Sequence, residues 1–171
     1  MKFIKFIPIL FIFFGIFPNK NITHAELRNS KDFKVFSNAG KKLSIANVEF
    51  YIKEGDEYIK NDDFENAKKS YLDARKLAKQ LASFYSDINT AFIGIDARIP
   101  NEVQKKGKET LEILAKANKR LTSLYIKNEK PDVAVPLLIE IIRIMSPESE
   151  EGKDAYEILI QLGFVETKFK G

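Results

Sequence analysis

The sequence predicts an all-α domain, and three observations support this prediction. Apolar residues recur at three- and four-residue spacing from about Ile45 to Leu162, which is the spacing of one face of an α-helix. The interruptions are short and contain residues that end helices or start turns, as at 61–63 and 146–148. Charged residues make up 30% of the chain and apolar ones 44%, so a packed core is expected rather than global disorder.

The first 25 residues have the layout of a secretory signal peptide. Lys2 and Lys5 precede an uncharged apolar run at 6–17, and the stretch ends in a small residue, Ala25. The run is shorter than the roughly 20 apolar residues that span a bilayer. A cleaved signal is therefore favoured over an uncleaved membrane anchor. We expect export to the periplasm or the medium, with membrane attachment only through an uncleaved N-terminal segment.

A linker is expected at 26–47, and a helical domain at 48–163. The first helical pattern begins near Ile45, and turn-forming residues interrupt it at 61–63. Asp63 can cap the next helix because its carboxylate accepts a hydrogen bond from a free backbone N–H group. The second helix is expected to end near Leu81.

Small and aromatic residues follow a fixed grid across these two helices: Tyr51, Gly55, Tyr58, Phe64, Ala67, Tyr71 and Ala74. This grid resembles the tetratricopeptide repeat (TPR), a helix–turn–helix unit of 34 residues. Gly55 and Ala67 carry almost no side chain, so the two helix axes can approach closely, and Tyr71 fills the remaining space. Glu54 and Lys79 depart from the family pattern. The resemblance implies a right-handed stack of helical hairpins that binds other proteins.

The rest of the chain fits this pattern less well. A degenerate second unit begins at Ala82, and a third begins at Ala115, where Asn118 and Thr122 fit poorly. Apolar positions continue without a break from 101 to 128, which favours one long helix over two short ones.

Two further helices are expected after the long one, giving about six in all. The first covers 132–145. The last is capped by Ser146, ends at Gly163 and caps the stack. A flexible tail follows at 164–171.

The chemistry of the chain argues against catalysis. There is no cysteine, and the single histidine, His24, would leave with the signal peptide. Most nucleophile–base pairs are then impossible, and the paired acids lie at turns or helix starts. No cofactor or metal site is indicated. Without the first 25 residues, 25 basic side chains face 24 acidic ones, which disfavours nucleic acid as a partner.

The TPR resemblance also implies which residues face a protein partner. Lys116 and Arg120 match positions where some TPR domains hold a carboxylate, whereas Ile52 and Asp56 stand where Lys and Asn would be needed. The candidate partner-binding residues are Ile52, Lys53, Asp56, Ile59, Lys60, Lys116 and Arg120.

The sequence therefore favours an exported, non-catalytic adaptor or scaffold that binds another envelope or secreted protein. One alternative is a ligand-binding or transport accessory protein with an apolar pocket near Tyr85, Phe92 and Leu111. Another is a hydrolase with two buried carboxylates within about 5–10 Å of each other.

Overall fold

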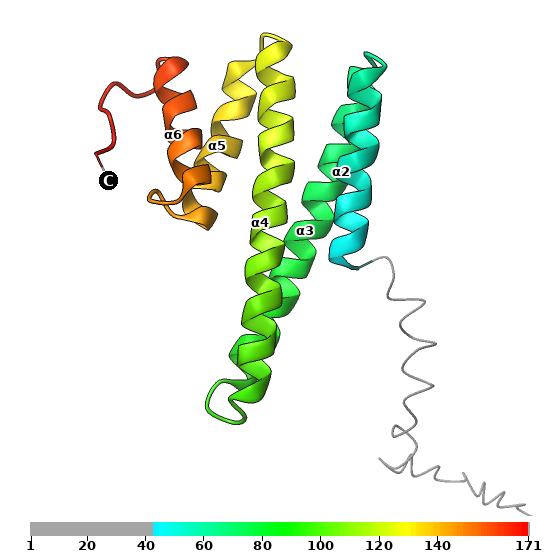
Figure 1. The fold of residues 1–171 in the computed structure, drawn as a ribbon, viewed down its shortest axis with the longest axis vertical. Helices are drawn as coiled ribbons and strands as arrows, with labels where there is room; N and C mark the ends of the chain where they lie inside the picture. The colour runs from blue at the N-terminus through cyan, green and yellow to red at the C-terminus, as the bar shows by residue number, and fades with distance from the viewer. Residues whose placement is uncertain (1–42, 171) are drawn as a thin grey trace, which may run out of the picture. The chain divides into compact units, whose positions relative to one another are not determined.

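The computed structural model of the chain describes residues 43–170 and shows an all-α fold, as predicted (Figure 1). This part of the chain contains no strand. Its helices are α2 (Ile45–Lys60), α3 (Phe64–Phe92), α4 (Arg98–Lys127), α5 (Pro131–Met145) and α6 (Glu150–Gln161). The expected signal peptide at 1–25 and the linker up to residue 42 lie outside the described residues.

Successive helices pack side by side as antiparallel neighbours. α3 packs against α2 and α4, and α5 packs against α4 and α6. In Figure 1, α2, α4 and α6 lie in front of α3 and α5, so these helices form two layers. Consequently α4 has a neighbour in the same layer on either side.

The turn between α2 and α3 forms where the sequence predicts it. Ser44 caps the start of α2, and its hydroxyl accepts a hydrogen bond from the N–H of Asn47. Asp62 takes a left-handed conformation with φ 56°, which ends α2. The carboxylate of Asp63 accepts a hydrogen bond from the N–H of Asn66 and caps α3, which confirms its predicted role.

α2 and α3 cross closely at Gly55, and this confirms the expected role of that glycine. A Cβ atom added to Gly55 would lie 2.4 Å from Cε1 of Tyr71. The Tyr71 ring therefore occupies the volume that any side chain at position 55 would need. Ala67 is fully buried next to the same contact region.

α3 is one helix of 29 residues, and the expected end near Leu81 is wrong. No Gly or Pro lies between Leu81 and Phe92, and the apolar pattern continues through Tyr85, which packs against the core. The helix ends only before Gly94, which has a positive φ of 79°. The separate helix expected from Ala82 is therefore the second half of α3, and the described part has five helices rather than six.

The predicted long helix is confirmed as α4, which begins three residues earlier than the predicted residue 101 and spans 30 residues. Pro100 lies in its first turn, where no intrahelical N–H bond is lost. α3 and α4 extend together beyond the ends of α2, α5 and α6, with residues 93–97 joining them at the far end (Figure 1).

α6 begins at Glu150, and its cap is Ser149 rather than the predicted Ser146. The hydroxyl of Ser149 accepts a hydrogen bond from the N–H of Gly152 at 3.0 Å. Ser146 instead ends α5, with φ 75° and ψ 143°. The serine that ends α5 and the serine that caps α6 are therefore different residues.

α6 ends at Gln161 with Leu162 as its C-cap, Gly163 follows as the predicted stop signal, and the tail after it contacts the helix. Gly163 has a φ of 77°, and the N–H of Phe164 donates to the carbonyl of Leu159. The Tyr156 hydroxyl donates to the Thr167 carbonyl at 2.7 Å, and the rings of Tyr156 and Phe169 lie edge to face. Residues 164–170, which the sequence suggested would be flexible, thus make specific contacts in the structure.

A polar network with Asn118 as its buried member ties α3, α4 and α5 together. Glu140 accepts hydrogen bonds from Arg75 at 2.7 Å and from Asn118 at 2.9 Å, and it pairs with Lys79. Burial alone would raise the pKa of the Glu140 carboxyl, but the bonds from Lys79, Arg75 and Asn118 outweigh it and hold that pKa below its ordinary value. Asn118, which fits the repeat pattern poorly, is thus fully buried and bonded on both sides.

Candidate protein-binding grooves on either side of α4

The first candidate site is a groove between α2 and α4 with α3 as its floor, which we call the α2–α4 groove. Its volume is about 440 Å³. Four of its residues are among the predicted partner-binding set and come from two different helices. The lining residues are Asp56, Ile59, Lys60, Tyr71, Arg120, Ser123, Leu124 and Lys127.

Three side chains from three helices form a hydrogen-bonded brace in this groove. The Tyr71 hydroxyl donates to Oδ1 of Asp56 at 2.6 Å, and Nε of Arg120 donates to the same oxygen at 2.8 Å. Nη2 of Arg120 donates to Oδ2 of Asp56 at 3.2 Å. The brace therefore links α2, α3 and α4, and both oxygens of Asp56 are already engaged.

Tyr71 acts as a neutral hydrogen-bond donor in the brace. Its side chain is only 2% exposed, and burial, followed by its bond to Asp56, raises the pKa of its hydroxyl. A negatively charged phenolate beside the Asp56 carboxylate would be strongly disfavoured. The brace can hold the groove open or position a partner, but it offers no free base.

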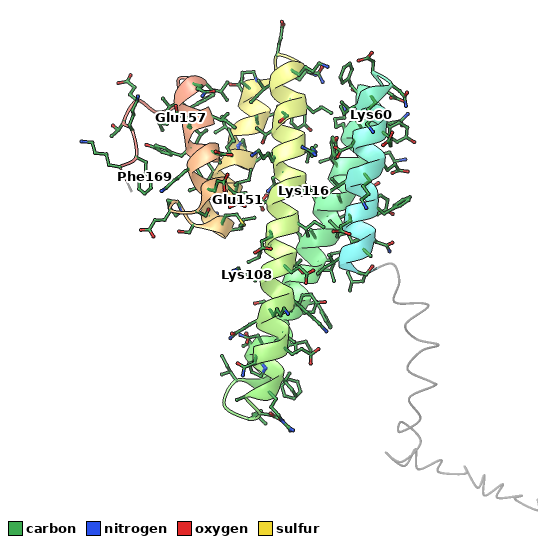
Figure 2. All side chains as sticks on the ribbon, in the orientation of Figure 1. Lys60, Lys108, Lys116, Glu151, Glu157 and Phe169 are labelled. Carbon is green, nitrogen blue, oxygen red and sulfur yellow. The ribbon has the colours of Figure 1, made fainter. Side chains whose placement is uncertain are left out.

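The cationic ends of Lys60 and Lys127 lie at the same groove. The Lys60 ammonium is bonded to Glu57 at 2.7 Å, and this hydrogen bond raises the pKa of the Lys60 side chain. The Lys127 ammonium lies 4.6 Å from the centre of the Phe64 ring. Figure 2 shows Lys60 at the C-terminal end of α2. Both ammonium groups can still be approached from solvent because both residues are exposed.

The structure separates the remaining predicted residues from this groove. Ile52, predicted among the partner-binding residues, is only 1% exposed and belongs to the core, so the expectation that its side chain lies on the surface is corrected. Its side chain points between α3 and α4 because it lies one turn after the buried Val48. Lys53 is exposed and lines neither groove. Lys116 is exposed midway along α4 (Figure 2). It lines a second groove, which lies on the opposite side of α4.

That second groove lies between α4 and α6 with α5 as its floor, and we call it the α4–α6 groove. Its volume is about 340 Å³, and its apolar base consists of Leu138 and Ile141 on α5, flanked by Ala115 on α4 and Ala155 on α6. Lys119 on α4 pairs with Asp154 on α6 at 2.9 Å across it. Its lining residues are Glu112, Ala115, Lys116, Lys119, Thr122, Ser123, Ile126, Leu138, Ile141, Glu151, Asp154, Ala155 and Ile158.

The alternative ligand pocket is only partly assembled. A depression of about 530 Å³ between α3 and α4 is lined by Tyr85 and Leu111, but Phe92 does not line it.

The acid pairs lie where the sequence suggested. Asp62 and Asp63 lie in the connection between α2 and α3, and Glu150 and Glu151 lie at the start of α6. No cluster of three or more acidic side chains suited to a metal ion occurs among residues 43–170.

Sequence reasoning missed four residues of the α2–α4 groove: Tyr71, Ser123, Leu124 and Lys127. Three of them carry a signal that could have been used, because Ser123, Leu124 and Lys127 follow Arg120 at three, four and seven positions along one helix face. Tyr71 was expected only to fill the core. Its hydroxyl reaches the groove because α2 and α3 are so close at Gly55.

Comparison with known proteins assigns no family: no protein-family model, no curated protein and no solved structure matches the chain. Among residues 43–170, no helix has both the length and the apolar character that crossing a membrane requires. The assignment of function to the two grooves therefore depends on their own residues and geometry.

Proposed function

We propose that the chain is an exported, non-catalytic adaptor with a TPR-like arrangement of helical hairpins, which binds another envelope or secreted protein. The observation that carries this proposal is the α2–α4 groove, where Asp56, Ile59, Lys60 and Arg120 converge from two helices. A groove that mixes apolar and charged groups suits a peptide segment of a protein partner.

The packing of the first hairpin supports the TPR-like part of the proposal. Gly55, Ala67 and Tyr71 meet at the crossing of α2 and α3, which is the role that the repeat grid gives them. The C-terminal half of α4 pairs with α5 as a second hairpin, and α6 covers its open side. The end of the α3–α4 hairpin around residues 93–97 extends beyond the other helices, and this extension departs from a regular repeat array.

The brace supports a role in holding a partner rather than in chemistry. Asp56 and Arg120 neutralise each other and set the distance between α2 and α4, so the groove exists before a partner arrives. A preformed groove lowers the entropy cost of binding because less of the protein must be ordered on association.

Site-specific photo-crosslinking in intact cells tests the proposal. A photoreactive residue at position 60 or 127 should give one reproducible crosslinked protein, because both side chains project at the α2–α4 groove. The same residue in place of Lys76, an exposed lysine on α3 that does not line the groove, is the matched control. Equal crosslinking at position 76, or none at positions 60 and 127, would count against the proposal.

A further inference from the structure

Thr122, one of the residues that line the α4–α6 groove, has a buried hydroxyl without a partner. Thr122 is only 1% exposed, and its Oγ1 is the one buried side-chain nitrogen or oxygen atom in residues 43–170 that makes no hydrogen bond. Thr110, a buried threonine on the same helix, instead donates to the carbonyl of Lys106 at 2.7 Å. A buried polar group that lacks a partner is costly, so the Thr122 hydroxyl marks a place where an acceptor is missing.

The charges at the rim restrict which molecule can supply that acceptor. Lys116 and Lys119 line the groove from α4, whereas Glu151 and Asp154 line it from α6 and Glu112 adds a third carboxylate. The rim therefore has both signs and a slight excess of negative charge. This disfavours a fatty acid or an anionic headgroup and favours a segment that is neutral or carries charges of both signs.

The volume and the hydroxyl together favour an extended peptide over a helix. A dry cavity of about 150 Å³ holds one benzene-sized group, so a groove of about 340 Å³ has room for two apolar side chains. The main-chain carbonyls of a helix are already bonded within it, whereas an extended segment has free ones that can accept from Thr122. In an extended segment, residues i and i+2 point to the same side, about 7 Å apart.

We propose that the α4–α6 groove binds an extended segment of a partner protein in which two apolar residues are separated by one residue. The two apolar side chains enter the floor between Ala115, Leu138 and Ala155, and a main-chain carbonyl between them accepts the Thr122 hydrogen bond. This inference rests on the proposed function as a protein-binding adaptor and adds the chemistry of the bound segment at a second groove.

Selection of random peptides on the purified full-length protein tests this inference. The selected peptides are expected to share two apolar residues at i and i+2. Their affinity should fall about five-fold for Thr122→Val, which keeps the shape but loses one hydrogen bond. The same variant should be more stable than the wild-type protein in urea, because it removes an unsatisfied buried group. A loss of binding together with a gain in stability separates a binding role from a folding defect.

Thr110→Val is the matched control, since it makes the same change in a buried residue of α4 outside the groove. It should lower stability, because it removes a hydrogen bond that is made, and leave peptide affinity unchanged. Selected peptides that bind wild type and Thr122→Val equally would overturn the site. A consensus with helical spacing of three and four, or no enrichment at all, would overturn the extended occupant.

Two further experiments test whether the groove binds something other than a partner peptide. Binding of dodecanoate that excludes the selected peptides and is weakened by Thr122→Val would replace the peptide by an acyl chain. Phe33 and Val35 are two apolar residues separated by one residue in the expected linker at 26–47. Enrichment seen only after Phe33→Ser and Val35→Ser would show that this linker fills the groove, and would overturn the partner. If the peptide tests fail while crosslinks at positions 60 and 127 persist, this inference is lost and the proposed adaptor function stands.

Discussion

Replacing Gly55 with alanine tests the close crossing on which the first hairpin depends. In most helix interiors, Gly→Ala stabilises by about 0.5–1 kcal/mol because it restricts the unfolded chain and favours the helix. At position 55 the new Cβ would lie 2.4, 2.6 and 2.9 Å from three atoms of the Tyr71 ring. Ordinary carbon–carbon contacts are about 3.5–4.0 Å, so the ring or the helix must shift by about 1 Å.

Tyr71 cannot move away freely. Its ring is buried, and its hydroxyl is held by Asp56 at 2.6 Å, so a shift would also weaken the brace. Overpacking a filled core costs about 1–3 kcal/mol, and a weakened hydrogen bond adds about 1 kcal/mol. Set against the helix-propensity gain, we expect Gly55→Ala to lower the free energy of unfolding by about 1–3 kcal/mol.

Gly107→Ala is the control for this experiment. Gly107 is also inside a long helix, but its added Cβ would lie 3.6 Å from Cβ of Tyr85, which is an ordinary contact. This variant should therefore be stabilised by about 0.5–1 kcal/mol. Urea unfolding monitored by circular dichroism measures the free energy of unfolding of both variants.

A double-mutant cycle identifies the Tyr71 ring as the cause. In a Tyr71→Leu background the obstructing ring is absent, so Gly55→Ala should stabilise by about 0.5–1 kcal/mol, as in an ordinary helix interior. The coupling energy between positions 55 and 71 should then be about 1.5–4 kcal/mol. A Gly55→Ala protein as stable as wild type, or a cycle without coupling, would refute the packing account.

Two further predictions concern the polar network and the turn after α4. The carboxylate of Glu140 has a lowered pKa in the folded state, so its contribution to stability is present above the unfolded pKa near 4.5 and is lost as pH falls through the lower folded value. The free energy of unfolding of wild type should therefore exceed that of Glu140→Gln by about 1–3 kcal/mol at pH 7, and this difference should shrink below about pH 4.5. Urea unfolding at each pH measures the difference, and a difference independent of pH would contradict the prediction. Glu129, in the turn after α4, has a φ of 56°, a backbone conformation that favours glycine. Glu129→Gly should therefore raise the free energy of unfolding by about 0.5–1 kcal/mol in the same assay. A lower free energy of unfolding would contradict the idea that the backbone is strained at this position.

Local signals predicted most of the helices, and they failed where two helices could be joined without a breaker. The turn at 61–63, the long helix α4 and the end at Gly163 follow from turn residues, unbroken periodicity and glycine. The division at Leu81 was wrong because it came from the length of a repeat unit rather than from any residue that stops a helix. Ser146 was assigned as a cap by residue type, although Ser149 has the geometry.

The residues that line the α2–α4 groove were predicted only in part, because a helix pattern does not specify how the helix is rotated against its neighbours. The sequence placed Asp56 and Arg120 on candidate faces, and the structure brings them within hydrogen-bond distance. The sequence also placed Ile52 on the same candidate face of its helix as Asp56, whereas packing against α3 and α4 buries the Ile52 side chain. Positions on one helix are related by its period, but their exposure depends on which neighbours cover them.

The helical class, the main turns and the small residue at the α2–α3 crossing could be predicted from the sequence, because these features depend on residues close in the chain. The continuation of α3 to Phe92, the brace of Asp56, Tyr71 and Arg120, and the unpartnered hydroxyl of Thr122 became visible only in the folded structure. These features depend on distances between residues far apart in sequence, which are fixed only when side chains from several helices pack together.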